Sequence, residues 1–293
     1  MTAYLLSIGT LICINGILAV TLNLIMGYAG IYSMAHGVLY GVSAYAAALI
    51  ALNVVPSFEL ALVTAMLVTT VVSVMVAGPA VRVRGEYFVA ASLGLQMVAI
   101  TVFTEWKTVT GGIGGLTGIP TPTLLGFNVQ SPVAFFVLAL ACLVLVTTVI
   151  TMLVRSRLGR SLQAIRDSEV GAAALGKHVA SVKIIAVAIS SALAAFAGTL
   201  LAFYVSFINV ESFTLEQSVF VMAMVVIGGV GTIAGPIVGA VLLVVLPALL
   251  TYVPFIPTAQ IGTVQQILYG LAMVLLMLFR PAGIVAGRQH GAS

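Results

Sequence analysis

The sequence predicts an all-α protein, a polytopic transmembrane helical bundle of about nine spans (eight to ten) that forms a single domain over residues 1–293. Hydrophobic residues make up 62% of the chain and charged residues 6%, whereas soluble domains are nearer half apolar and a quarter charged. The mean hydropathy is +1.26. The apolar runs are continuous rather than alternating, which favours membrane helices over the strands of a barrel.

Nine apolar runs approach the roughly 20 residues that a helical span needs. In chain order the expected helices cover residues 3–26, 34–55, 58–80, 86–105, 131–154, 183–206, 216–230, 234–252 and 262–280. No basic segment or cleavage pattern opens the chain, so we expect the first run to be a retained span. Glycines interrupt 34–55 and 216–252, and re-entrant segments are the alternative there.

The cations predict the orientation, because short cytoplasmic loops are rich in Lys and Arg. Nine helices put three basic groups on one side, expected to be cytoplasmic together with the C-terminus: Arg82 and Arg84, the six cations of 155–183, and Arg280 and Arg288. Lys107 is then the one cation on the other face. Two long segments remain outside the membrane, an external loop at 106–130 and a cytoplasmic loop at 155–183. These cations follow apolar runs, so we expect a lipid bilayer as partner and no nucleic acid.

Two apolar segments, 26–52 and 227–250, share a design that indicates an internal repeat. Each opens with paired glycines, breaks, and continues as a helix led by Gly-x-x-x-Gly. Interrupted helices in corresponding halves are typical of a transport path near the midplane. Small residues four apart equally allow close helix packing, and both interpretations stay open.

Motifs for catalysis are missing from the sequence. Residues 171–178, "GAAALGKH", approach a phosphate-binding loop, but His178 replaces the hydroxyl that ligates magnesium and no strand precedes it. No metal-ligand spacing involves Cys13 or Cys142, so we expect no metal site. We therefore expect no enzyme and no cofactor in this chain.

Carboxylates are expected only outside the spans. Glu59, Glu86 and Glu105 fall at helix ends, and Glu211 and Glu216 in a short external loop. Ion-coupled carriers usually need ionisable groups within the membrane, so this distribution argues against one. His36, alone near the start of its span, is either a proton relay or substrate contact, or a hydrogen-bonded histidine at a helix end.

The loop 155–183 concentrates the scarce charge. It reads "RSRLGRSLQAIRDSEVGAAALGKHVASVK", with Arg166, Asp167 and Glu169 followed by alanines and a glycine. Small residues let another protein approach a helix closely, while charges at the rim fix register and partner choice. A solvated loop is the alternative, but this pattern favours a docking site.

At these residues the sequence resembles the branched-chain amino acid ABC transporter permeases, and among them the LivM-like subunit. The resemblance extends through "GYAGIYSMAHG" (27–37), "TGGIGGLTGIP" (110–120), "VIGGVGTIAGPIVGA" (226–240) and "LFRPAGIVAG" (278–287). It implies a membrane-spanning permease in the bacterial cytoplasmic (inner) membrane that moves hydrophobic amino acids inward. The implied partners are a second permease in a heterodimer, two cytoplasmic ATPase subunits that bind ATP and Mg²⁺, and an external solute-binding protein.

The resemblance also assigns roles to residues. The loop 155–183 is similar to the family's ATPase-coupling loop, with the coupling residues Arg166, Asp167, Glu169, Ala172, Ala173 and Gly176. The external loop is expected to meet the binding protein through Thr110, Gly111, Gly112 and Gly115. We place the translocation path at the broken segments, at Gly30, Ser33, His36, Gly37, Gly228, Gly231 and Gly235. The alternatives are an ABC permease for urea, amides or another small solute, and a stand-alone passive channel.

Overall fold

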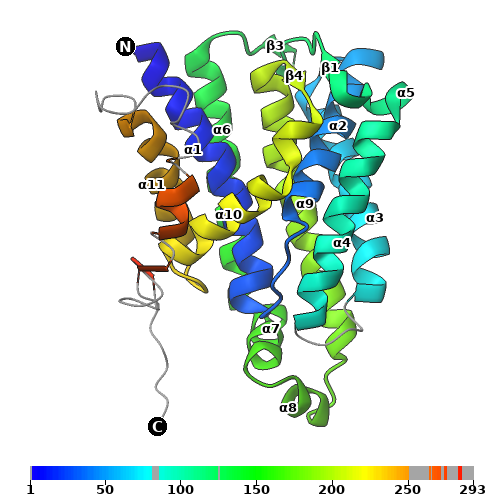
Figure 1. Cartoon of the computed structure of the whole chain (residues 1–293), viewed down its shortest axis with the longest axis vertical. Coiled ribbons are helices and arrows are strands. Elements are labelled where there is room, and N and C mark those ends of the chain that lie inside the picture. Colours follow the sequence, from blue (N-terminus) through cyan, green and yellow to red (C-terminus); the bar gives the residue numbers. More distant parts are fainter. Residues whose placement is uncertain are drawn as a thin grey trace.

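The computed structural model is a bundle of upright helices with short strands at one end (Figure 1). It describes residues 2–80, 86–124, 126–250, 264, 266–271, 274–275 and 283–285. Within these, seven helical stretches are long and apolar enough to cross a membrane: Ala3–Tyr28, His36–Asn53, Phe58–Val76, Phe88–Glu105, Pro132–Arg155, Val179–Val205 and Val210–Gly228. The predicted polytopic helical bundle is confirmed. The predicted ninth span, 262–280, lies largely outside the described residues.

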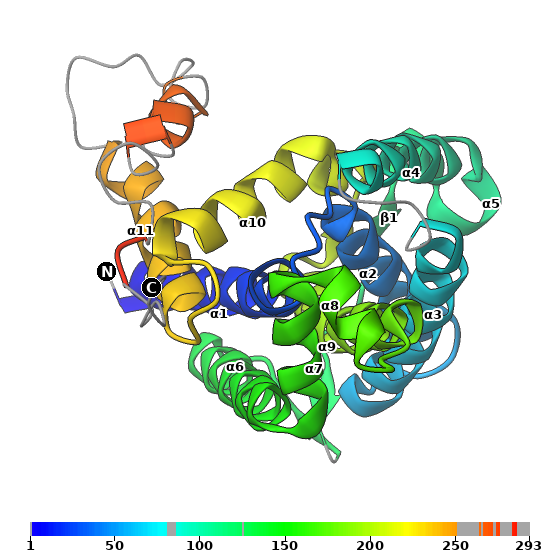
Figure 2. The ribbon, with the colours of Figure 1, turned by 90° about the horizontal axis from the view of Figure 1, so that it is seen from below.

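The main helices follow the predicted order: α1 (Thr2–Asn23), continued by the π-helix η1 (Leu24–Tyr28), α2 (His36–Asn53), α3 (Phe58–Ala80), α4 (Glu86–Glu105), α6 (Pro132–Arg155), α9 (Val179–Val205), α10 (Leu215–Gly228) and α11 (Gly235–Leu250). Between α6 and α9 lie α7 (Arg157–Asp167) and α8 (Glu169–Ala174). Figure 2, viewed from below, shows α6 on one side of α1 and α10 on the other.

Small residues allow α9 to occupy the interior against α1, α2 and α3. One stretch of α9, residues 193–200, is completely buried and consists largely of alanine, glycine and threonine. At Gly198 an added Cβ would lie 2.7 Å from the carbonyl oxygen of Tyr40, so only glycine allows this contact with α2. In a bilayer such close packing takes the place of the hydrophobic effect in joining helices.

Large apolar side chains cover the outward faces of α3, α4 and α6. Examples are Leu67, Met75, Met97, Val144 and Met152, all more than half exposed. An exposed apolar surface of this kind is expected where lipid, rather than water, surrounds a helix.

The paired strands gather at the end of the bundle opposite α7 and α8 (Figure 1). There β1 (Leu116–Thr117) pairs with β4 (Phe207–Ile208), and β2 (Thr123–Leu124) pairs with β3 (Phe127–Asn128), both antiparallel. The short helices α5 (Lys107–Thr110) and η2 (Gly112–Gly114) lie between α4 and β1 in the chain. The predicted external loop therefore folds as one compact region, with Lys107 at the end remote from the basic loop 155–183.

The helices α10 and α11 are short within the described part of the chain, and α10 reaches the length of a candidate span, Val210–Gly228, only together with η3 (Val210–Phe213). By themselves α10 and α11 contain 14 and 16 residues, about 21 and 24 Å at 1.5 Å per residue, whereas the hydrocarbon core is about 30 Å thick. In Figure 1, α10 runs across the bundle near mid-height rather than parallel to the upright helices. Within residues 216–250 the glycine-rich segment thus forms two helices separated by a break at 229–234.

The position of α10 corrects the expectation for the loop before it. Gln96, in the middle of the 20-residue α4, donates its side-chain Nε2 to the carbonyl of Phe213 at 2.8 Å. Phe213 ends the 3₁₀ helix η3 (Val210–Phe213), which carries Glu211, and Glu216 follows in the first turn of α10. Both carboxylates therefore lie near the mid-height of the bundle. The expectation of an external loop was wrong because the chain turns inward after β4 before α10 begins.

Candidate functional site

Two serine caps define the shape of the basic loop. Ser156 caps α7 by accepting hydrogen bonds from the backbone amides of Leu158 and Gly159. Ser168 ends α7 and caps α8, accepting from the amide of Gly171 at 3.0 Å. Capping by serine satisfies amides that a helix start leaves free. The loop 155–183 therefore folds as two short helices at an angle, which we call the α7–α8 segment.

The apolar face of α7 fixes this segment on the bundle. Leu162 and Ile165 are fully buried, 0% and 1% exposed, whereas Arg157 and Arg160 of the same helix are exposed. This spacing puts the two apolar side chains on one helical stripe. The segment is consequently anchored on the end of the bundle, and it is not a free loop.

Ion pairs hold the charged residues at the α7–α8 junction. Arg166 pairs with Asp167 at 3.1 Å, and Glu169 pairs with Lys183 near the start of α9. The side chain of Lys183 is only 10% exposed, compared with 48% for Glu169. The Glu169–Lys183 pair thus joins the segment to α9, whereas the side chain of Asp167 is 69% exposed and pairs only with its neighbour Arg166 among the described residues.

The outermost surface of the segment is small and apolar. Val170 is 79% exposed and Leu175 is 82% exposed. Ala173 and Gly176 are also exposed, whereas Ala172 is 3% exposed and packs inward. Val170 and Leu175 were missed in the sequence, although two apolar residues within a charged loop were a usable signal. We call Val170, Ala173, Leu175 and Gly176 the docking tip.

The two glycine-broken segments predicted for the path lie against each other. An added Cβ at Gly27 would lie 2.5 Å from the backbone nitrogen of Gly231. The Asn23 side chain accepts from the amide of Gly231 at 2.9 Å and donates to the carbonyl of Thr232 at 2.7 Å. The breaks of the two repeat-like segments therefore meet at one place.

A buried polar network surrounds the start of α2. The Nε2 atom of His36 lies 3.0 Å from the hydroxyl of Thr21. The amide of Gly37 donates to Ser218 at 2.9 Å, and Ser218 donates to the side chain of Gln96 at 3.3 Å. His36 is 1% exposed, and its Nδ1 atom has no partner among the described residues.

The remaining predicted path residues differ in accessibility. Gly228 and Gly235 are buried, and an added Cβ at Gly228 would overlap the backbone of Gly235. Gly30 is exposed, and Ser33 and Gly231 are partly exposed. Gly37, Gly228 and Gly235 are thus each buried in a close packing contact. Gly30, Ser33 and Gly231 are at least partly exposed at the surface of the chain.

A cavity of about 700 Å³ lies beside α10. Its polar lining includes Glu211, Glu216, Gln217 and Tyr269. Asn209 donates to Glu211 at 3.4 Å, and among the described residues neither glutamate forms an ion pair. Charge at membrane depth is costly unless it faces water or a partner. This cavity therefore has the chemistry expected beside an aqueous path.

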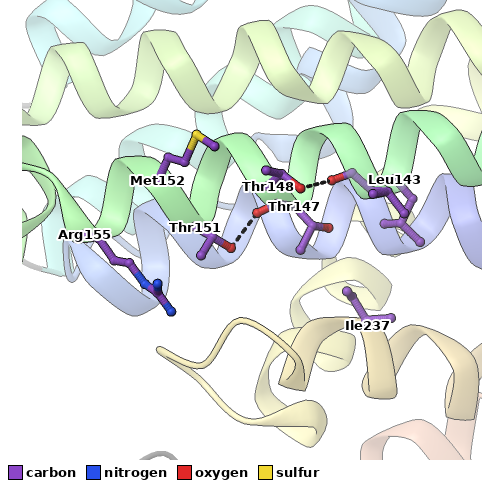
Figure 3. Close-up of a pocket in the computed structure, with 8 residues that line it drawn as sticks. Leu143, Thr147, Thr148, Thr151, Met152, Arg155 and Ile237 are labelled. Carbon is purple, nitrogen blue, oxygen red and sulfur yellow. Dashed lines mark hydrogen bonds between the residues drawn. The ribbon is translucent and has the colours of Figure 1, made fainter.

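Two other cavities are mainly apolar. One of about 570 Å³ lies among α2, α3 and α4. The other, about 410 Å³, follows α6 opposite Ile237 of α11 (Figure 3). The hydroxyls of Thr148 and Thr151 in this groove donate to their own helix, to the carbonyls of Val144 and Thr147. These two hydroxyls are therefore already engaged, whereas the buried hydroxyl of Thr147 has no partner among the described residues and Arg155 also lines the groove.

The predicted binding-protein contacts occupy the strand end of the bundle. Thr110 is 3% exposed and donates to the carbonyl of Phe103 at 2.6 Å. Gly111, Gly112 and Gly115 have φ of 75°, 62° and 67°, a backbone conformation that favours glycine. These four residues shape the loop. The side chains that it exposes most are Ile113 and Phe127, 80% and 78% exposed.

Comparison with known proteins identifies the family. A family model described as "Branched-chain amino acid transport system / permease component" matches residues 4–279. The chain belongs to this family. The resemblance inferred from the sequence is thereby confirmed, and the chain is an ABC-type permease and a multi-pass membrane protein.

Individual relatives agree with this assignment. The chain is 32% identical to the high-affinity branched-chain amino acid transport system permease protein LivM of Escherichia coli, over 95% of this chain and 69% of the relative. It is 28% identical to a probable LivM of Methanocaldococcus jannaschii, over 94% and 81%. An autoinducer 2 import system permease, LsrC of Salmonella typhi, is 30% identical over 51% of this chain and 42% of its own length. No solved structure matches the chain.

Proposed function

We propose that this permease is the membrane-spanning subunit of an ATP-driven importer for leucine, isoleucine and valine in the bacterial cytoplasmic membrane. It pairs with a second permease, receives the amino acid from an external solute-binding protein, and carries no ATPase site of its own. Two separate ATPase subunits bind ATP and Mg²⁺ in the cytoplasm, on the same side as the α7–α8 segment and the C-terminus.

The observation that carries this proposal is the docking tip. Its exposed apolar residues, Val170 and Leu175, stand on a segment that ion pairs and buried leucine and isoleucine hold against the bundle. An apolar knob on a rigid support suits insertion into a partner's groove, because little conformational entropy is lost on binding. ATP binding that favours one arrangement of the ATPases would then shift the permease between inward- and outward-facing states.

The cavity beside α10 supports an amino acid over urea or an amide. The carboxyl groups of Glu211 and Glu216 offer hydrogen-bond acceptors that suit the ammonium group of an amino acid, which urea and simple amides lack. The predicted path residues lie in or next to the breaks between η1 and α2 and between α10 and α11. They are Gly30, Ser33, His36, Gly37, Gly228, Gly231 and Gly235. We propose that these residues and the cavity together form the wall of the path.

The experiment is uptake of labelled leucine by cells that express the transporter with its native partners, before and after ATP depletion. We expect uptake to require ATP, and to be inhibited by unlabelled isoleucine and valine. If urea or acetamide inhibits uptake and isoleucine and valine do not, the solute is a small amide rather than a branched-chain amino acid. Uptake that survives ATP depletion would favour a passive channel, and dependence on a proton or sodium gradient would favour a carrier.

A further inference from the structure

One side chain connects the α7–α8 segment to the broken helices inside the bundle. The Nη1 atom of Arg166, in the last turn of α7, donates to the carbonyl oxygen of Gly27 at 2.8 Å. Gly27 belongs to η1, the π-helix that continues α1. π-helical turns are rare and frequently occur at functional sites, because they leave carbonyls without their usual partners.

The backbone around Arg166 is shaped to receive this side chain. Gly30 has φ of 69°, and a Cβ added there would lie 3.0 Å from Cγ of Arg166. A Cβ added at Gly231 would lie 3.5 Å from Nη1 of the same residue. The guanidinium therefore lies close to both η1 and the turn between α10 and α11, and glycines provide the room.

A second contact extends the connection to α10 and α11. Asn23 immediately precedes η1, and its side chain binds the backbone of both Gly231 and Thr232. Residues 229–234 form the turn that joins α10 to α11, with φ of 126° at Gly229 and 76° at Gly231. Displacement of α7 thus reaches this turn through Arg166, η1 and Asn23, each in direct contact with the next.

We infer that Arg166 is a positioning residue that couples movement of the α7–α8 segment to the turn between α10 and α11. This inference rests on the proposed function and adds the route by which an ATPase acts on the cavity beside α10. Coupling between distant sites requires an element with two arrangements whose equilibrium both sites influence, and the turn between α10 and α11 is the element that we assign to this role. The Asp167 carboxylate assists by holding the guanidinium at 3.1 Å.

The test uses the complete transporter purified with its own subunits. Arg166→Met removes the donor and keeps an apolar stem, Arg166→Lys restores a cationic donor, and Arg160→Met is the control on the exposed face of α7. We expect Arg166→Met to retain the ATPase subunits and ATP hydrolysis while leucine uptake falls about tenfold, within the usual range of coupling free energies. Arg166→Lys should recover part of the uptake.

A second measurement reports the turn directly and needs no substrate. Ala234, exposed beside the turn, is changed to cysteine, and its reaction with N-ethylmaleimide is timed with and without ATP and vanadate. The native Cys13 and Cys142 are buried and should contribute little. We expect ATP to change the labelling rate of Ala234→Cys when Arg166 is present, both in the otherwise native chain and in the Arg160→Met control. ATP should have no effect on the labelling rate when Arg166→Met is also present.

Non-additivity distinguishes coupling from general damage. If both residues act in one chain of contacts, Asn23→Ala combined with Arg166→Met should reduce uptake no further than either change alone. An ATP effect at Ala234→Cys that persists in Arg166→Met would overturn the inference. Loss of ATP hydrolysis in step with uptake would also overturn it, and would leave Arg166 as a docking residue. If the unmodified protein has no ATPase partner and ATP does not change its labelling rate, the proposed function itself is contradicted.

Discussion

At the scale of single residues, Gly27 shows how a missing side chain allows two broken segments to meet. Its backbone lies against that of Gly231, and an added Cβ would lie 2.5 Å from the Gly231 nitrogen and 2.8 Å from its Cα. Both are backbone atoms, which cannot turn aside as a flexible side chain can. Gly27 is therefore required for the contact between the two broken segments.

We predict that Gly27→Ala destabilises the protein by about 1–3 kcal/mol, the usual cost of overpacking a tight interior. Gly94→Ala is the matched control, because no atom lies within 4 Å of the added Cβ. The measurement is the temperature at which the detergent-purified protein loses its monodisperse peak. Equal temperatures for the two variants would contradict the close contact.

At the scale of elements, the α7–α8 segment is held by an asymmetric ion pair. Lys183 is nearly buried and Glu169 is half exposed. Removing the exposed partner leaves a buried ammonium without a counter-charge, whereas removing the lysine leaves a carboxylate that water can solvate. The two single substitutions should therefore have unequal effects.

We predict that Glu169→Ala, which removes the acceptor as well as the charge, costs about 2 kcal/mol, the loss expected for a hydrogen bond to a charged group. Lys183→Met should cost clearly less. Thermal unfolding of both variants, together with the amount of copurifying ATPase, measures the difference. Because Lys183→Met keeps the apolar stem and removes only the ammonium, a larger loss for this variant than for the glutamate variant would contradict the expected asymmetry of the pair.

Sequence reasoning succeeded where the pattern repeats over many residues. The long spans through α9 follow from apolar runs alone, and the shared glycine design of 26–52 and 227–250 anticipated breaks that the structure brings together. It failed for Glu211 and Glu216, because hydropathy gives the length of a segment and not its depth. The position of η3 depends on tertiary contacts, among them the hydrogen bond from Gln96 to the carbonyl of Phe213 and the packing of the Phe213 ring against Tyr40 and Tyr45.

The candidate site was predicted in the same uneven way. The charged loop could be located from its composition, but the inward direction of Arg166 and Glu169 depends on partners far away in the chain, at Gly27 and Lys183. Since charge in a helix is usually read as its solvated face, the apolar docking tip at Val170 and Leu175 was overlooked.

At the scale of the whole molecule, three regions are arranged in series. The strand end carries the exposed Ile113 and Phe127. The helix α10, which lines the cavity of about 700 Å³, lies near mid-height, and α8, with the docking tip, lies at the end opposite the strands (Figure 1). This arrangement suits transfer of a solute from an external protein toward a cytoplasmic energy source.

We predict that Glu211→Gln combined with Glu216→Gln raises the KM for leucine uptake about tenfold, corresponding to about 1.4 kcal/mol of lost attraction for the ammonium group. Glu105→Gln, exposed at the end of α4, is the control with the same chemical change. Assembly with the ATPase should be unaffected. An unchanged KM would show that the cavity beside α10 is not part of the path that leucine takes.

The most direct test of the central claim is copurification of the ATPase subunit from native membranes. Val170→Asp with Leu175→Asp should lose the ATPase, since both side chains stand on the docking tip. Ile113→Asp, an equally exposed residue at the opposite end of the bundle, should retain it. If the double variant keeps its ATPase, or if the native chain has none, the α7–α8 segment is not the coupling site.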